Sequence, residues 1–256
     1  MQAVVHAVIH RGAVRPGNED ALAVGDWIAG NDVERPKRFA HDLSRPLPVI
    51  VADGMGGHAA GDTASRYVTE TIQQAAGEVA DAQAASDLLI DANRRLYEAM
   101  QQGIGAPGMG TTVAGVILRA SAVVQFNVGD SRIYRMDPGE RSLTQRSVDD
   151  TPGAKMDDGR TALQTTPVVS QSLGGQPRYT AIEPHAEDEV PPVVGTCYLV
   201  CTDGLSDLLD VGEIGEILAR ADGDEGDFRA VDRLFQAAMD RGGKDNVTIA
   251  LVRCTD

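Results

Sequence analysis

Short apolar runs separated by only a few residues constrain the fold of this 256-residue chain more than any other feature. Parallel strands need a crossover connection of roughly a dozen residues or more, whereas antiparallel strands can be joined by a tight turn. The pattern therefore predicts antiparallel sheets. The runs are AVVHAVIH (3–10), PVIVADG (48–54), TTVAGVIL (111–118), AVVQFNVGD (122–130), SRIYRM (131–136), TCYLVCTDG (196–204) and NVTIALVRC (246–254).

Helical periodicity fills stretches between these runs. Apolar and small side chains recur every three or four residues from Asp62 to about residue 79 and from Ser86 to Gln102, and again from Val231 to Met239. Asp62 suits the N-cap position of the first helix. Because strand runs and helix pairs are segregated along the chain, we predict an α+β fold with layered sheets and helices packed outside them.

One irregular segment, at about 147–175, breaks this regular pattern. It carries many turn residues and little periodicity, and long irregular segments in a compact domain are often functional, so we expect a flap there. No repeat or long linker divides the chain, and we expect a single domain over residues 1–256.

The charge balance argues against two classes of partner. The chain has 38 acidic and 23 basic residues, and its formal net charge of −15 opposes binding to nucleic acid or to an anionic membrane. No apolar run approaches the roughly 18 residues of a membrane span, and no signal peptide is visible. We therefore expect a cytoplasmic location and a monomer. Three cysteines are too few for a disulfide framework.

Aspartates follow or end apolar runs repeatedly. Any one of them alone is most simply a turn residue. Five at similar places can converge at one edge of antiparallel sheets, where carboxylates raise one another's pKa unless a cation lies between them. A ligand set made only of oxygen suits Mg²⁺ or Mn²⁺ better than Zn²⁺. The five are Asp20, Asp53, Asp130, Asp203 and Asp245.

The segment VADGMGGH, which follows a predicted strand, adds two candidates. A flexible turn after Asp53 lets the Gly54 carbonyl face the same metal, and the next glycines bring His58 to that edge. Acidic neighbours would raise the pKa of His58, which suits proton donation to a leaving oxygen. The alternative is a simple turn that leads into the next helix. His41 and His185 lie in proline-containing loops, where we expect them to be solvated.

Arg15 is the candidate for binding a phosphate. It lies shortly before Asp20, and its planar fork can hold a phosphate group with two hydrogen bonds. Arg11 is close enough to be a rival, and either arginine could instead be a solvated surface residue.

Six motifs occur in the order and with roughly the spacing of one known family. They are VRPGNED, VADGMGGH, GMGTT, NVGDSRIY, LVCTDGLSD and KDNVTIALV. From about residue 12 to 252 the chain resembles the metal-dependent protein phosphatase type 2C family in its compact bacterial form. The resemblance implies an α-β-β-α sandwich, two antiparallel sheets flanked by helix pairs, with a binuclear Mn²⁺ or Mg²⁺ centre at one edge.

The resemblance also implies roles for the candidate residues. Asp53 would bridge two metal ions, the Gly54 carbonyl would bind one, and Asp203 and Asp245 would complete the set. Glu19 and Asp20 would lie beside the metals and act partly through bound water.

Three further residues receive roles in the same way. Arg15 would contact the substrate phosphate, His58 would be the general acid, and Asp130 would bind a third, weaker metal together with Asp203. The segment RSVDDTPGAKMDDG departs from the usual family pattern, so the resemblance assigns the flap neither a metal nor a substrate preference.

The function implied is hydrolysis of phosphoserine or phosphothreonine in proteins by a hydroxide that bridges two metal ions. The partners would be phosphoproteins made by a serine/threonine kinase. One alternative is an inactive phosphoprotein-binding scaffold, although such a protein would be expected to lose one of Asp53, Asp203 or Asp245. The other is a binuclear phosphoesterase acting on nucleotides or other small phosphate esters.

Overall fold

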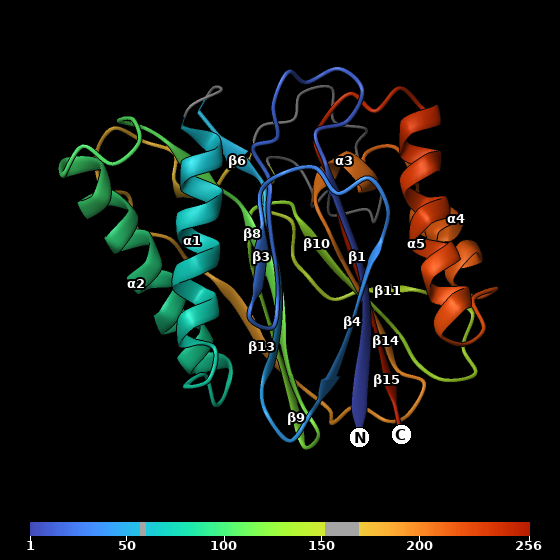
Figure 1. Cartoon of the computed structure of the whole chain (residues 1–256). Coiled ribbons are helices and arrows are strands. Elements are labelled where there is room, and N and C mark those ends of the chain that lie inside the picture. The colour runs from blue at the N-terminus through green and yellow to red at the C-terminus, as the bar shows by residue number, and fades with distance from the viewer. Residues whose placement is uncertain (57–59, 152–168) are drawn as a thin grey trace, which may run out of the picture.

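Two six-stranded antiparallel sheets stacked face to face form the centre of the molecule (Figure 1). The computed structural model describes residues 1–56, 60–151 and 169–256. The first sheet has the order β11 (Thr144–Gln145), β10 (Arg132–Met136), β14 (Cys197–Cys201), β15 (Val247–Thr255), β1 (Gln2–His10), β4 (Lys37–Asp42). The second has the order β13 (His185–Glu189), β9 (Ala122–Val128), β8 (Val113–Arg119), β5 (Leu47–Ala52), β2 (Ala21–Val24), β3 (Trp27–Ala29).

Helices cover the outer face of each sheet. α1 (Gly61–Ala75) and α2 (Ala82–Gln101) pack on the second sheet, while α3 (Asp203–Ser206), α4 (Val211–Leu218) and α5 (Gly223–Asp240) lie on the side of the first (Figure 1). The predicted α-β-β-α sandwich is therefore confirmed. None of the described helices is long and apolar enough to cross a membrane.

Three apolar cores explain why many strands are apolar along their whole length. In β1, Val5 and Ile9 face the core between the sheets, whereas Val8 faces the core under α5. A strand buried on both faces cannot alternate between apolar and polar residues. Cys197 and Cys201 both face the core under α5 as free, buried thiols.

The helix boundaries differ from the sequence prediction. α1 begins at Gly61, and Asp62 lies in its first turn instead of at its N-cap. α2 begins at Ala82, because the side chain of Asp81 caps it by accepting a hydrogen bond from the Ala84 amide. The helix α4 was not predicted from the sequence.

A small third sheet was not predicted either. Its strands are β6 (Gly54–Met55), β7 (Gly110–Thr111) and β12 (Leu173–Gly174), in the order β12-β7-β6. The strand β12 belongs to the segment predicted as an irregular flap, whose residues 152–168 lie outside the described part of the chain. Through β7, this sheet joins the end of that segment to Gly54.

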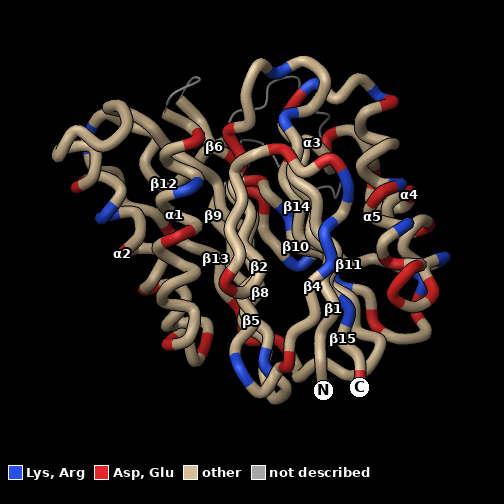
Figure 2. Tube along the Cα trace, viewed as in Figure 1, with Lys and Arg blue, Asp and Glu red and all other residues tan. Residues whose placement is uncertain are grey.

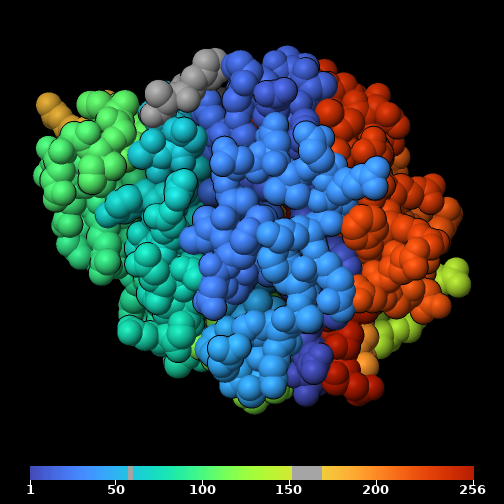
Figure 3. Space-filling model, viewed as in Figure 1, coloured from blue at the N-terminus to red at the C-terminus, as the bar shows by residue number. Residues whose placement is uncertain are grey.

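The end of the sandwich between β6 and α3 gathers acidic residues, as Figure 2 shows in red. The N-terminal part of the chain, in blues in Figure 3, lies over the viewed face between the α1 side and the α5 side. The two termini lie together at the opposite end of the sandwich, because β1 and β15 pair from Gln2 with Thr255 onward (Figure 1).

Candidate active site

A cavity of about 310 Å³ opens where the acidic strand ends meet. Asp20 is buried close to this cavity, since its carboxyl group interacts with those of Asp203 and Asp245. His58 lies outside the described residues. The predicted residues that line the cavity are Arg15, Glu19, Asp53, Gly54, Asp130, Asp203 and Asp245.

Asp53 is held in place through its backbone. Its N–H donates to Thr112 Oγ1 at 3.2 Å, and its carbonyl accepts from the Thr112 N–H at 2.9 Å and from Thr111 Oγ1 at 2.8 Å. Thr112 Oγ1 also lies 2.8 Å from Ser131 Oγ, next to Asp130. Thr112 therefore connects the turn at Asp53 to the loop of Asp130, the predicted ligand of a third metal.

Gly54 is required because there is no room for a side chain, and not because of the flexible turn expected from the sequence. A Cβ atom at this position would lie 2.2 Å from the Gly61 carbonyl oxygen and 2.4 Å from that of Glu19. Only glycine fits where the first turn of α1 and the Glu19 segment approach so closely.

Asp20 is oriented by two hydroxyl groups. Its Oδ2 accepts hydrogen bonds from Thr202 Oγ1 at 3.0 Å and Thr248 Oγ1 at 2.5 Å, while its buried Oδ1 has no hydrogen-bond partner in the described part of the chain. Burial, followed by the charges of Asp203 and Asp245, raises the pKa of Asp20 to about 8 in spite of these hydrogen bonds.

The other carboxyl groups interact strongly with one another. Burial, followed by the charges of neighbouring acidic groups, raises the pKa of Asp53 and of Asp203 well above the usual range. Burial is the largest cause that raises the pKa of Asp130, to about 6, and the charge of Asp149 adds to this effect. Asp203 Oδ1 is a second buried oxygen without a partner in the described residues.

These features fit a divalent cation. No group of three or more histidine, cysteine or acidic side chains within residues 1–56, 60–151 and 169–256 is already arranged to hold a metal ion. However, two unpaired buried oxygens and mutually raised pKa values are what a cation among the carboxylates would relieve. The all-oxygen donor set matches the preference of Mg²⁺ and Mn²⁺.

Arg15, not its rival Arg11, belongs to this cavity. The Arg15 guanidinium contacts Asp245 Oδ2 at 2.5 Å, and its side chain is about half exposed. The side chain of Arg11 instead lies 3.6 Å from Asp32, outside the cavity lining. Among the described residues, Arg15 is the only lysine or arginine that lines the cavity.

Several residues that shape this site were missed in the sequence. Thr202 and Thr248 orient Asp20, Thr112 holds Asp53, and Asn246 holds the Arg15 loop. Thr202, Asn246 and Thr248 lie inside aspartate motifs, so the polar neighbours of those aspartates are a signal in the sequence. Thr112 lies in GMGTT, a motif without an aspartate, and no local signal links it to Asp53.

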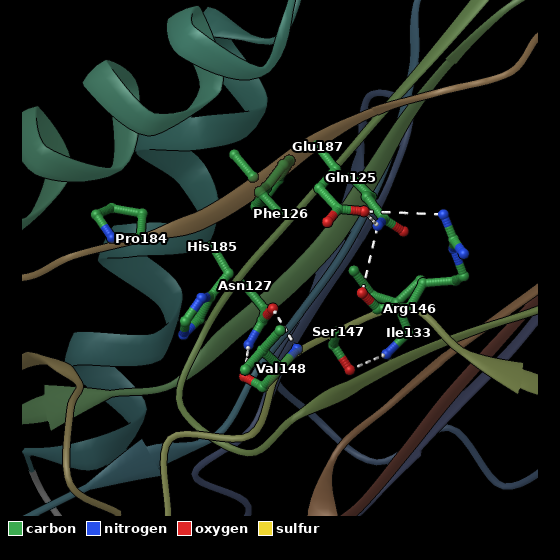
Figure 4. Close-up of a pocket in the computed structure, with 11 residues that line it drawn as sticks. Gln125, Phe126, Asn127, Ile133, Arg146, Ser147, Val148, Pro184, His185 and Glu187 are labelled. Atoms are coloured by element: carbon green, nitrogen blue, oxygen red, sulfur yellow. Dashed lines mark hydrogen bonds and ion pairs between the residues drawn. The ribbon is translucent and has the colours of Figure 1, made fainter.

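A second cavity, of about 240 Å³, lies at another edge of the sandwich (Figure 4). It shares no lining residue with the first among the described residues. Asn127 hydrogen bonds to the backbone of Val148, and Gln125 hydrogen bonds to Glu187. His185 was expected to be solvated in a loop but lies on β13, with Nε2 2.9 Å from Asp150. These side chains mainly bind one another, so this cavity is the weaker candidate.

Comparison with known proteins gives a consistent result. The family model for protein phosphatase 2C matches residues 38–251. The serine/threonine protein phosphatase PstP of Mycobacterium tuberculosis is 30% identical over 263 residues, which cover 96% of this chain and 44% of PstP. The serine/threonine phosphatase stp of Listeria monocytogenes is 28% identical over 260 residues, which cover 94% of this chain and 92% of the relative. The chain thus spans less than half the length of PstP.

Solved structures agree with these sequence relatives. The crystal structure of Mycobacterium tuberculosis PstP/Ppp superposes with a TM-score of 0.79 at 27% identity and covers 100% of both chains. The catalytic domain of PstP, in complex with two manganese ions, has a TM-score of 0.77 at 28% identity and also covers 100% of both chains.

Proposed function

This chain belongs to the protein phosphatase 2C family, and from this membership we propose that it hydrolyses phosphoserine and phosphothreonine in proteins with two Mn²⁺ or Mg²⁺ ions. One observation carries the proposal: four carboxyl groups from distant parts of the chain interact around one cavity. Those groups belong to Asp20, Asp53, Asp203 and Asp245.

The proposed roles follow the donor set of the cavity. Asp53, Asp203, Asp245 and the Gly54 carbonyl would hold the two ions, with Asp20 and Glu19 beside them and partly acting through water. Asp130 would share a third, weaker site with Asp203. Divalent ions, when bound, supply Lewis-acid activation of a water molecule.

Arg15 would bind and orient the phosphate. Its guanidinium contacts Asp245 at the edge of the acidic cluster. Arg15 adds one positive charge to the cavity, which cannot balance the negative charge of four ionised carboxyl groups. A dianionic phosphate therefore also needs the bound cations to offset the acidic side chains. His58, which lies outside the described residues, would protonate the leaving serine or threonine oxygen.

The substrates we propose are phosphoproteins made by a serine/threonine kinase, and the active species is a monomer. Phosphate release from a phosphothreonine peptide, measured with Mn²⁺, with Mg²⁺ and with a chelator, tests the activity. We expect release with either metal and none with the chelator.

The same assay separates the alternatives when a nucleotide is offered in parallel. Faster turnover of the nucleotide than of the peptide would favour a phosphoesterase for small molecules. Turnover of neither, with Mn²⁺ binding intact, would favour an inactive scaffold and contradict the proposal.

A further inference from the structure

Asn246 directly follows the cavity residue Asp245 and is buried, with 5% of its surface exposed. Its side-chain amide makes three hydrogen bonds to one loop. Oδ1 accepts from the Glu19 N–H at 2.8 Å, and Nδ2 donates to the carbonyl oxygens of Arg11 and Gly17, both at 3.0 Å. Both amide hydrogens are therefore used.

These hydrogen bonds hold the backbone before and after Arg15 in the sequence. The loop from residue 11 to 19 contains no helix or strand, so a regular hydrogen-bond pattern does not fix it. One further backbone bond, from the Ala13 N–H to the Gly243 carbonyl at 2.8 Å, ties the loop to the same neighbouring segment. A Cβ atom on Gly12 would lie 2.1 Å from the Asp245 carbonyl oxygen, which shows how closely the two segments pack.

The backbone of Asn246 also contacts the start of α3, which carries Asp203. A Cβ atom on Gly204 would lie only 1.9 Å from the Asn246 carbonyl oxygen. Asn246 thus lies where three segments meet: the loop with Arg15, the start of α3 with Asp203, and its own segment with Asp245.

We propose that Asn246 is a positioning residue, which holds the backbone on both sides of Arg15 so that the guanidinium is already placed for the substrate phosphate. The inference rests on the proposed function, in which Arg15 binds that phosphate. A prepositioned arginine loses less conformational entropy when it binds, so its loop should set the affinity for phosphate more than the rate of the chemical step.

Asparagine is the residue type that these three bonds require. An aspartate would keep the acceptor for the Glu19 N–H but would lose both donors and place a negative charge against two carbonyl oxygens. An alanine would leave one buried N–H and two carbonyls without their partner.

The experiment is a double-mutant cycle between Asn246→Ala and Arg15→Ala, read out as the inhibition constant of inorganic phosphate and as kcat and KM for a phosphothreonine peptide with Mn²⁺. We expect Asn246→Ala to raise KM and the phosphate inhibition constant roughly tenfold and to lower kcat by less than about threefold. In the Arg15→Ala background, Asn246→Ala should change the phosphate constant by less than about twofold, because its effect passes through Arg15.

The matched control is Asn93→Ala on α2. Asn93 is also buried and uses both amide atoms to bind the segment that begins with β12, donating to the Thr180 carbonyl at 2.9 Å and accepting from the Gly174 N–H at 2.8 Å. We expect this variant to lower the melting temperature without raising the phosphate constant. If Asn246→Ala does not fold, Asn246→Asp, which keeps the volume and the Glu19 bond, takes its place in the cycle.

An unchanged phosphate constant in Asn246→Ala, or an equal change with and without Arg15, would overturn the inference. If the wild-type protein releases no phosphate from the peptide, the proposed function fails instead. The dissociation constant of inorganic phosphate, measured by calorimetry with Mn²⁺, then replaces the inhibition constant, and the same cycle decides the role of Asn246. No detectable phosphate binding by the wild-type protein would also overturn it.

Discussion

Asp53 and Asp203 show how burial and charge act together on single side chains. Burial is the largest cause that raises the pKa of each, and the charges of nearby carboxyl groups add to it: those of Asp20 and Asp245 for Asp53, and that of Asp53 for Asp203. A divalent cation changes the sign of this interaction, because it attracts both ionised groups. The same side chains that oppose each other in the protein alone would therefore cooperate in the proposed metal-bound state.

Asp53→Asn tests this argument. We expect the metal-free variant to be more stable than wild type by about 1 kcal/mol, since an amide removes one repelling charge and can donate a hydrogen bond to Asp203. Mn²⁺ should no longer raise its melting temperature, and Mn²⁺-dependent phosphate release should be lost. Calorimetry with and without Mn²⁺ measures the first two effects.

The control for Asp53→Asn is Asp62→Asn, which makes the same change of charge at an exposed residue of α1. It should respond to Mn²⁺ as wild type does. Full Mn²⁺-dependent activity in Asp53→Asn would contradict the metal-bridging role.

The packing of α5 on the first sheet depends on a buried ion pair. Asp227 on α5 has 2% of its side chain exposed, and its two carboxylate oxygens accept from Arg253 Nε and Nη2 at 2.6 Å each. Arg253 lies on β15, so the pair joins helix and sheet directly. The hydrogen bond with Asp227 raises the pKa of Arg253. Burial of the guanidinium acts in the opposite direction but is the smaller effect.

We expect Asp227→Ala to lower the free energy of unfolding by about 3 kcal/mol, because it leaves the Arg253 guanidinium largely buried without its carboxylate. Urea denaturation measures this loss. Glu225→Ala on the same helix removes an exposed pair with Arg229 and should cost less than about 0.5 kcal/mol. Equal losses in the two variants would show that burial does not decide the strength of these pairs.

Charge is distributed unevenly over the whole molecule. The formal net charge is −15, and acidic residues gather at the end of the sandwich that holds the cavity (Figure 2). Raised pKa values there mean that the folded metal-free protein binds more protons than the unfolded chain above the usual pKa of aspartate. Stability from this source is present at low pH and is lost as the pH rises towards the raised pKa values.

We therefore expect the melting temperature of the metal-free protein to decrease as the pH is raised from about 6.5 to about 8, which is near the pKa of Asp20. His6 acts in the opposite direction, but only at lower pH. Burial lowers its pKa, so the stability it contributes is present above its ordinary pKa of 6.5 and is lost as the pH falls below that value.

Mg²⁺ at saturating concentration should remove most of this decline, and its affinity should rise with pH because ionised ligands bind it. Calorimetric melts at several pH values, with Mg²⁺ and with chelator, check both points. Asp20→Asn should flatten the metal-free profile. A metal-free melting temperature that rises steadily to pH 8 would contradict the electrostatic account.

Local patterns predicted most inner strands of the two large sheets but not their edge strands β3, β4, β11 and β13. The closely spaced apolar runs predicted antiparallel sheets, and the periodic stretches predicted α1, α2 and the last part of α5. The two-residue strands β6, β7 and β12 carry no periodicity, and so no local pattern could predict them. Helix starts were misplaced at both helices of the α1–α2 pair. In α1 the N-cap is Ala60, without a side-chain cap, and in α2 Asp81 caps the helix before the apolar periodicity from Ser86 begins.

The sequence by itself determined which chemical groups were available: acidic residues at strand ends, an arginine before Asp20 and a glycine after Asp53. Only the tertiary structure decided how they are held. Thr248 is 228 residues from Asp20 and Asn246 is 227 residues from Glu19, yet each pair is hydrogen bonded. Such contacts depend on how strands from the two ends of the chain pair and pack, and spacing along the chain does not record that arrangement.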